Sequence, residues 1–188
     1  MGNNLSAVEL GTGRTAVAIT AGRNHYAVIL DNGSVKTWGE GTWGQLGQEH
    51  NSIIGNESNE MGDNLPIVDL GIGRIAIAIE AGYNHTTVIL DNGSVKVWGK
   101  NTYGQLGQGN TDNIGDNANQ MGNNLTAVDL GTGRTAVAIA AGRYSTGVIL
   151  DDGSVKVWGN NTFGQLGQGN ITQIGDGTGE MGNNLSAV

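Results

Sequence analysis

Two histidines occupy equivalent places in the chain and are the first residues whose chemistry needs an explanation. His25 and His85 both follow an Ala-Gly-x-Asn sequence, and Ser145 stands at the third equivalent position. Two imidazoles can bind one metal ion, but the chain has no cysteine, and no nearby glutamate completes a ligand set. We therefore predict that these histidines form hydrogen bonds within or between structural units and bind no metal.

Three aspartates recur at one position, each two residues before the glycine of an expected tight turn: Asp31, Asp91 and Asp151. An aspartate at such a position commonly caps its own turn. In an arrangement with rotational symmetry, the same residues would form a ring of carboxylates for a cation or a basic partner. Both interpretations stay open, and the aspartates are candidate partner-facing residues. The oxygen-rich stretch Asn110–Asn119 lacks the spacing and the final glutamate of a calcium loop, so no calcium site is predicted.

Aromatic residues recur at two positions. The first position is always tryptophan, which favours burial between neighbouring units: Trp38, Trp98 and Trp158. Five residues later the type varies between Trp43, Tyr103 and Phe163. The variation leaves two interpretations for this second set, packing in the core or exposure to a partner or a sugar. We treat its members as candidate partner-facing residues.

Nothing in the chain indicates catalysis. The sequence Gly11-x-Gly13-x-x-Ala16 has the spacing of a dinucleotide-binding motif, but that motif needs a following helix, and Ala16 begins a strand-like run. No Ser/His/Asp set and no carboxylate pair occurs at one asymmetric place, as an active site requires. We predict a protein that is not an enzyme and has no catalytic residue, cofactor or metal.

Charge and composition exclude further classes of protein. Nine Lys and Arg residues against 17 Asp and Glu leave a net charge of −8, which disfavours nucleic acid and anionic membranes as partners. No apolar run approaches the roughly 18 residues of a membrane span. The 34 glycines do not fall at every third position and proline occurs once, so a collagen helix is excluded.

The chain repeats itself with a period of 60 residues, which is the spacing between Met1, Met61, Met121 and Met181. All three copies are identical in 32 of the 60 columns, without insertion or deletion, which indicates recent duplication. The units are residues 1–60, 61–120 and 121–180, followed by a partial fourth repeat, 181–188, identical to residues 1–8. We predict a single repeat array over residues 1–188.

Each unit carries the signals of four short strands. In the second unit these are Leu65–Leu70, Arg74–Glu80, Thr86–Leu90 and Ser94–Trp98. The turn Asp91-Asn92-Gly93 indicates a hairpin, because Asn and Gly both tolerate positive φ. Four strands in a 60-residue unit predict an all-β fold, a β-propeller of four-stranded antiparallel blades with three blades per chain. The Ala-Gly pair at Ala81-Gly82 and its equivalents suit close approach of neighbouring blades.

Three segments resemble regulator of chromosome condensation repeats of the bacterial type: AGRNHYAVILDNGSVKTWGEGTWGQLG, AGYNHTTVILDNGSVKVWGKNTYGQLG and AGRYSTGVILDDGSVKVWGNNTFGQLG. The shared pattern is A-G-x-x-H, an apolar strand, a D/N-G turn and W-G-x-N-x-x-G-Q-L-G. The resemblance implies a β-propeller of usually about seven blades. It also implies a structural signature of Trp38, Trp98 and Trp158 with Gln45, Gln105, Gln165, Leu46, Leu106 and Leu166. Members of the family include exchange factors, ubiquitin-ligase modules and a β-lactamase inhibitor.

Assembly with a second chain is expected. Three blades cannot close a ring, because both end blades would expose apolar faces. We expect a homodimer of six blades. The strand Leu5–Leu10 of one chain is expected to swap into the third blade of the other and displace residues 181–188. Deletion of residues 181–188 would then have little effect, whereas deletion of residues 1–8 would weaken the dimer.

The function that these features favour is a non-enzymatic protein-interaction scaffold that binds itself and another protein. Two alternatives remain at this stage. The first is an amplified or engineered repeat fragment that assembles into a propeller and binds no ligand. The second is a carbohydrate-binding propeller that uses its aromatic residues.

Overall fold

The computed structural model describes residues 4–188, and the described chain forms three antiparallel sheets of three strands each. Met1, the first residue of the repeat frame, lies outside the described residues. The strands are β1 (Ala16–Ala21), β2 (His25–Leu30) and β3 (Val35–Gly39) in the first unit, β4 (Ala76–Ala81), β5 (His85–Leu90) and β6 (Val95–Gly99) in the second, and β7 (Ala136–Ala141), β8 (Ser145–Leu150) and β9 (Val155–Gly159) in the third. Single-turn 3-10 helices follow at η2 (Gly62–Asn64), η3 (Gly122–Asn124) and η4 (Gly182–Asn184). Within residues 4–188, no helix is long and apolar enough to cross a membrane.

The hairpin turns form where the sequence predicts them, but with a different backbone conformation. Gly33 has a φ of 79°, whereas Asn32 is not among the residues with positive φ. The Gly33 N–H donates to the Leu30 carbonyl at 2.8 Å, and the Leu30 N–H donates to the Ser34 carbonyl at 2.8 Å. This is a three-residue loop that ends in a left-handed glycine. The Asn32 side chain accepts a hydrogen bond from the Ser34 N–H at 3.1 Å, so it caps the turn.

The predicted fourth strand of each blade is not formed as a strand. Residues 65–70 run beside β3 and make one ladder-like hydrogen bond, from the Val68 N–H to the Val35 carbonyl at 2.9 Å. Leu65, Val68 and Leu70 are the buried residues of this segment. Their spacing of three and then two does not follow the alternation that a pleated strand needs, so the segment packs on the blade without extending the sheet. The blades are therefore three-stranded, with a packed outer segment.

A buried lysine in each unit holds this outer segment in place. Lys96 Nζ donates to the carbonyls of Leu70 at 3.0 Å and Gly122 at 2.6 Å, and Lys36 and Lys156 make the equivalent pairs. Burial lowers the pKa of Lys96 and Lys36, and the nearby carboxylates Asp69 and Asp63 oppose this effect. Each lysine thus ties the start of its own unit to the 3-10 helix that begins the next repeat.

The partial fourth repeat occupies the outer position of the third blade. The Val188 N–H donates to the Val155 carbonyl at 2.9 Å, and Lys156 Nζ donates to the Gly182 carbonyl at 2.7 Å. Leu185 is 3% exposed, whereas Leu5 is 69% exposed. The expected swap of an N-terminal strand into this position is not seen in the single chain and stays a prediction. A swapped strand would have to displace these contacts.

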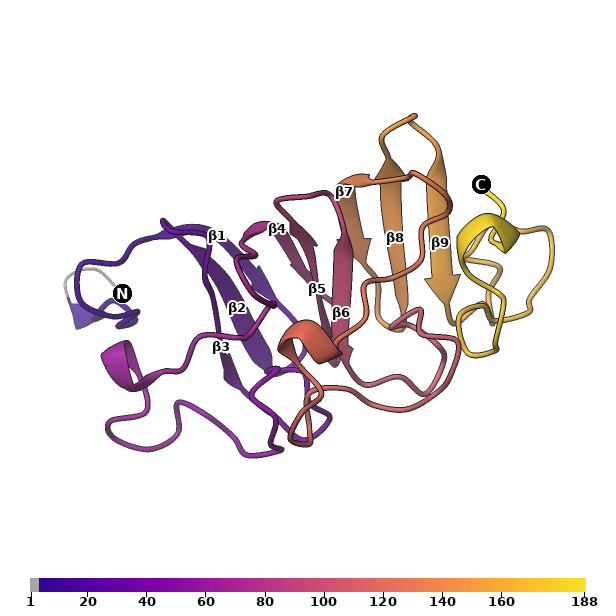
Figure 1. Ribbon diagram of the computed structural model, residues 1–188. Helices are drawn as coiled ribbons and strands as arrows, with labels where there is room; N and C mark the ends of the chain where they lie inside the picture. The colour runs from indigo at the N-terminus through magenta and orange to yellow at the C-terminus, as the bar shows by residue number, and fades with distance from the viewer. Residues whose placement is uncertain (1–3) are drawn as a thin grey trace.

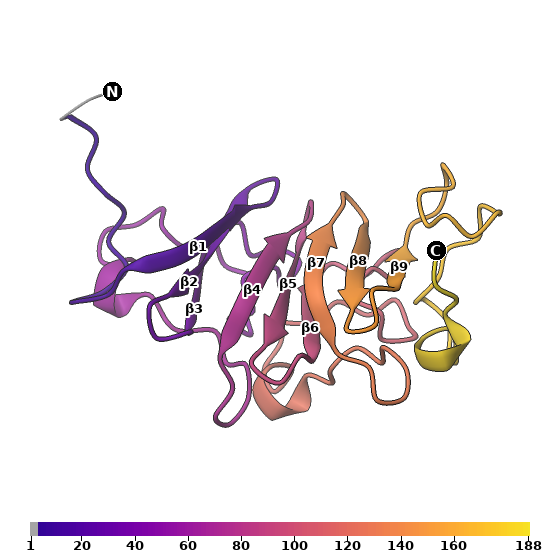
Figure 2. The same ribbon diagram turned by 90° about the horizontal axis from the view of Figure 1, so that it is seen from above.

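The three sheets stand side by side in chain order, with the first and third sheets at opposite ends of the row (Figures 1 and 2). The two larger hydrophobic clusters are shared between neighbouring units. Ala27, Ile29 and Val35 of the first unit pack with Val88 and Trp98 of the second, and the second and third units are joined in the same way. A single unit therefore cannot bury its apolar residues without a neighbour, as in other repeat folds.

Close approach between blades explains the Ala-Gly pairs. A Cβ atom on Gly22 would overlap the His25 ring and the Gly82 carbonyl, and a Cβ atom on Gly82 would overlap the His85 ring and the Gly142 carbonyl. Only glycine leaves room for both neighbours at these positions.

Candidate interaction surface

The two sets of candidate partner-facing residues lie at opposite ends of the blades. Strands β2 and β3 are antiparallel, with His25 paired to Gly39 and Ile29 paired to Val35. Asp31 follows the carboxyl end of β2, and Trp43 follows the carboxyl end of β3. The aspartates therefore share one end of the molecule with the β2–β3 turns, and the varied aromatic residues share the other end with the β1–β2 turns.

Arginines of the same units pair with the recurrent aspartates. The Nη1 atom of Arg14 lies 3.5 Å from the carboxylate of Asp31, and the equivalent pairs Arg74–Asp91 and Arg134–Asp151 are both at 3.1 Å. Each aspartate side chain is between 36% and 39% exposed. Within residues 4–188, no three histidines and carboxylates come together in a way that could hold a metal ion. The aspartates are thus turn residues whose charge a neighbouring guanidinium compensates.

The opposite end carries a cluster of aromatic and cationic side chains, which we call the aromatic–cation surface. Tyr83 lies at its centre, with the guanidinium of Arg23 4.8 Å and that of Arg143 4.7 Å from its ring centroid. The ring centroids of Tyr144 and Tyr83 are 5.7 Å apart, and the guanidinium of Arg143 also lies over the Tyr144 ring. The surface comprises Arg23, Trp43, Tyr83, Lys100, Tyr103, Arg143, Tyr144 and Phe163.

The varied aromatic residues form the outer part of this surface. Lys100 Nζ lies 4.1 Å from the ring centroid of Trp43, and the rings of Tyr103 and Tyr144 are 5.0 Å apart. Each of these contacts joins one unit to the next. Phe163, in the third unit, is 91% exposed. Lys100 thus covers one face of the Trp43 ring, and the Tyr144 ring packs against Tyr103. The ring of Phe163, by contrast, is open to solvent.

The β1–β2 turns bring the two arginines together around a hollow. The Arg23 N–H donates to the Tyr83 carbonyl at 3.0 Å, and the Tyr83 N–H donates to the Arg143 carbonyl at 3.3 Å. The hollow between these turns has a volume of about 310 Å³ and is lined by residues 21–23, 81–83 and 141–143. Within residues 4–188, neither Arg23 nor Arg143 forms a salt bridge. The hydrogen bond with Tyr144 is the main cause that raises the pKa of Arg143 above its ordinary value.

The repeat signature itself lies in the junctions between blades. Trp98 and Trp158 are completely buried, and their indole N–H groups donate to the carbonyls of Gln45 at 3.1 Å and Gln105 at 3.0 Å in the preceding unit. Leu46, Leu106 and Leu166 are also completely buried. The side-chain oxygen of each glutamine accepts a hydrogen bond from the backbone N–H two residues earlier, at 2.8 Å to 2.9 Å for Gln45, Gln105 and Gln165. Trp38 is partly exposed, because no unit of this chain covers it.

The histidines bridge the same junctions. His25 Nε2 lies 3.0 Å from the Thr86 hydroxyl, and His85 Nε2 lies 3.1 Å from the Thr146 hydroxyl. Burial lowers the pKa of His25 to about 4, against the opposing effect of Glu40. Burial and then the charge of His25 lower the pKa of His85 to about 3. Both imidazoles are therefore neutral at pH 7 and serve as hydrogen-bonding residues between blades.

Sequence reasoning did not select the central residues of the aromatic–cation surface. Arg23, Tyr83 and Arg143 occupy one column, and Tyr144 replaces an asparagine of the other two copies. The available signal was variation at neighbouring columns of a turn, directly after the invariant Ala-Gly pair. That signal becomes meaningful only when the three turns are known to meet.

Comparisons with known proteins agree with this architecture. The family model "Regulator of chromosome condensation (RCC1) repeat" matches residues 16–45, 76–105 and 136–165, and a second model with the same description matches residues 32–89. The chain is 29% identical over 159 residues to the E3 ubiquitin-protein ligase HERC2 of Homo sapiens, covering 84% of this chain and 3% of that protein. It is 30% identical over 151 residues to the X-linked retinitis pigmentosa GTPase regulator of Mus musculus, covering 80% of this chain and 14% of that protein.

Solved structures show the same fold at lower identity. Human WBSCR16 matches with a TM-score of 0.63 and 21% identity, over 86% of this chain and 38% of that one. Prp20p from Saccharomyces cerevisiae matches with a TM-score of 0.61 and 20% identity, over 81% of this chain and 32% of that one. The chain thus spans a small part of the curated relatives and about a third of these structures. Its three repeats, their blade junctions and the matching family models place it among the proteins built from regulator of chromosome condensation (RCC1) repeats.

Proposed function

We propose that this chain is a non-enzymatic protein-interaction scaffold and that the aromatic–cation surface is its binding surface. The observation that carries the proposal is the cluster of Arg23, Tyr83, Arg143 and Tyr144 at one end of the blades. Tyrosine, tryptophan and arginine are the residues that contribute most to binding energy in protein interfaces. Their rings and guanidinium groups are already packed against one another, so little conformational freedom is lost on binding.

The charge of the surface indicates the chemistry of its partner. The chain carries a net charge of −8, yet Arg23 and Arg143 meet at the hollow without a salt-bridge partner among the described residues. An arginine pair of this kind fits the carboxylates of an acidic protein segment, because each guanidinium can donate two parallel hydrogen bonds. We therefore expect a partner with an acidic, extended segment.

The relatives support a binding role for this chain, but it covers too little of them for their activities to be assigned to it. The yeast protein Prp20p binds Gsp1p and histones, and Kap60 is bound to the same yeast protein in a second structure. Those partners belong to that protein, of which this chain covers 32%. A protein with the same fold thus binds other proteins, which supports a binding role for this chain.

The carbohydrate-binding alternative gains no support from this arrangement. Stacking of a sugar needs an open aromatic face, but Lys100 lies over Trp43, and Tyr103 packs against Tyr144. Phe163 is the largely open member of this set, and in the blades before it the equivalent ring contacts the next unit. The exposure of Phe163 is therefore explained by the absence of a following unit.

Closure into a homodimer of six blades belongs to the same proposal. Three blades leave a sheet face open at each end of the row (Figure 1). Two copies would cover both faces and would also place two aromatic–cation surfaces around one axis. The axial end would then present four arginines, and binding to one acidic partner would gain from this duplication.

A selection from a displayed peptide library tests the binding proposal. The purified chain should enrich peptides rich in Asp and Glu, and their affinity should fall as salt is raised. In fluorescence polarisation with one selected peptide, the double variant R23A/R143A should bind at least about tenfold more weakly, since two charge-assisted contacts are lost.

The arginines at the other end of the blades provide a matched control. The variant R14A/R134A removes the same number of charges from the aspartate end and should bind the peptide as the unmodified chain does. Equal loss of affinity in both double variants would show that the peptide responds only to net charge. Selected peptides without acidic enrichment would refute the proposed partner chemistry.

A further inference from the structure

The two ends of the row of blades expose faces that are buried everywhere inside it. The trailing face is the side of the third sheet that has no following blade, formed by Gly142, Ser145, Gly147, Ile149, Val155 and Val157. Ile149 is 41% exposed, whereas its equivalents Ile29 and Ile89 are 2% and 1% exposed. The leading face is the side of the first sheet that has no preceding blade, formed by Ile19, Tyr26 and Trp38.

The leading face shows the same contrast with interior junctions. Ile19 is 66% exposed, and the equivalent Ile79 of the second unit is 6% exposed. Each end face thus carries the apolar residues that complete a junction inside the row, and each lacks only its counterpart.

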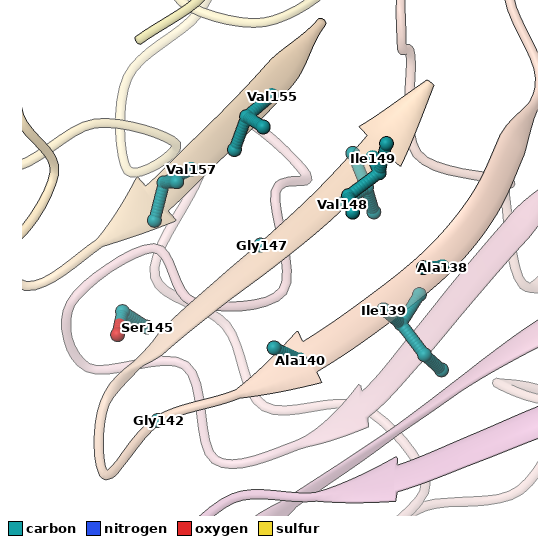
Figure 3. Close-up of a pocket in the computed structure, with 10 residues that line it drawn as sticks. All are labelled: Ala138, Ile139, Ala140, Gly142, Ser145, Gly147, Val148, Ile149, Val155 and Val157. Carbon is teal, nitrogen blue, oxygen red and sulfur yellow. The ribbon is translucent and has the colours of Figure 1, made fainter. Parts of the chain in front are cut away.

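The trailing face contains a hollow beside the short side chains of β8. Its volume is about 250 Å³. Figure 3 shows Ser145 and Gly147 on the middle strand β8, between Val157 of β9 and Ala140 of β7. In the first two units the place of Ser145 is taken by His25 and His85. A Cβ atom on Gly142 would meet only the Ser145 residue and no carbonyl of a following blade. The replacement of an imidazole by a hydroxymethyl group leaves the space open.

The leading face carries the opposite replacement. Inside the row, each histidine meets a threonine of the next unit, as in the pairs His25–Thr86 and His85–Thr146. The residue of the first unit in the threonine column is Tyr26, which stacks on Trp38 with 5.7 Å between ring centroids. Tyr26 is 48% exposed, whereas Thr86 and Thr146 are completely buried. A large residue on one end face thus corresponds to a small residue on the other.

The hydrogen-bonding groups of the two faces also correspond. Inside the row, each tryptophan donates its indole N–H to the carbonyl of a buried glutamine in the preceding unit. On the leading face, Trp38 Nε1 has no such partner within residues 4–188. On the trailing face, Gln165 is exposed, whereas Gln45 and Gln105 are 0% and 1% exposed. The unused donor and the exposed acceptor occupy complementary positions.

We propose that the trailing face binds the leading face of another copy of this chain, with the Tyr26 ring in the hollow beside Ser145; this inference rests on the homodimer closure proposed above. The Trp38 indole then donates to the Gln165 carbonyl, as in the interior junctions. Interior junctions pair a histidine with a threonine, whereas this junction would pair Ser145 with Tyr26. The summed side-chain volume of the two pairs is nearly the same, as close packing of the interface requires. The exchange also distinguishes this junction from the interior ones, because a histidine opposite Tyr26 would overpack the same space.

Three variants test the proposal by light scattering and sedimentation velocity. The unmodified chain should have the mass of two or more chains of 19.4 kDa each. Y26T leaves a void and S145H overfills the hollow, so each should raise the dissociation constant by about tenfold or more. The double variant Y26T/S145H recreates the interior His–Thr pair and should recover most of the lost affinity. Both residues are at least partly exposed in the single chain, so the variants are expected to fold.

Substitutions elsewhere on the end blades serve as controls. Val17 and Val137 are 66% and 62% exposed, and Ile77 in the middle unit is 60% exposed, so this column does not face a junction. V17T and V137T should leave the dissociation constant unchanged. If the unmodified chain is still monomeric at a concentration of about 100 µM, well above the dissociation constant of a micromolar complex, the proposal is overturned. Single variants without effect, or a double variant that recovers nothing, would overturn it as well.

Discussion

Mild acid should destabilise this fold through its two buried histidines. In the folded chain the pKa of His25 is about 4 and that of His85 is about 3, because burial disfavours the charged imidazole. In the unfolded chain both side chains have the ordinary value of 6.5. The unfolded state therefore binds more protons between these values, so the free energy of unfolding falls as the pH is lowered through 6.5.

The magnitude follows from the proton-binding difference. Between about pH 7 and about pH 5.5, each histidine should lower the free energy of unfolding by about 1.2 kcal/mol, and the pair by about 2.5 kcal/mol. The result depends little on the exact pKa values of the folded state, since both lie well below about pH 5.5, the acidic end of the interval. Carboxylates with lowered pKa, such as Asp63 and Asp152, act in the same direction but at more acidic pH. Their contribution falls outside the chosen interval.

Urea unfolding followed by tryptophan fluorescence measures this effect at several pH values. H25N/H85N removes both titrating groups and keeps side chains that can donate to or accept from Thr86 and Thr146. This variant should lose most of the pH dependence between about pH 7 and about pH 5.5, whatever its absolute stability. H50N changes a histidine in an exposed loop and should keep the dependence. A slope that is unchanged in H25N/H85N would refute the assignment of the acid sensitivity to the blade junctions.

Two further predictions concern the junctions and the end of the chain. Trp98→Ala should lower the free energy of unfolding by about 3–5 kcal/mol, because Trp98 is completely buried. Trp38→Ala should lower it by clearly less, because Trp38 is partly exposed. Equal losses in urea titrations would contradict this. Deletion of residues 181–188 should cost about 3 kcal/mol or more, because Leu185 is buried and the segment is hydrogen-bonded to the third blade. Deletion of residues 4–8 should change the monomer's stability by less than about 1 kcal/mol, and the opposite order would support the strand swap expected from sequence.

The repeat, the strand pattern and the family could be predicted from the amino-acid sequence alone. A period of 60 residues is visible without any coordinates, and the runs that became β4, β5 and β6 are rich in β-branched residues with a turn signal between them. Local chemistry is sufficient for these features, because a hairpin needs only its turn and its alternation. The outer segment was predicted as a strand for the same local reason, but packing on Val35 and Lys36 decided its form.

The partners of the recurrent residues could not be predicted before the blades were seen packed together. The aspartates were matched with arginines 17 positions earlier, and the histidines with threonines 61 positions later. The first separation follows from the hairpin register within one blade, in which Ala76 pairs with Leu90, whereas the second depends on how one blade packs against the next. For the same reason, Arg23, Tyr83 and Arg143 form a surface only because three turns meet at one end of the blades. Contacts between repeats are fixed by the rotation from blade to blade, and that rotation is a property of the packed array, which no single unit encodes.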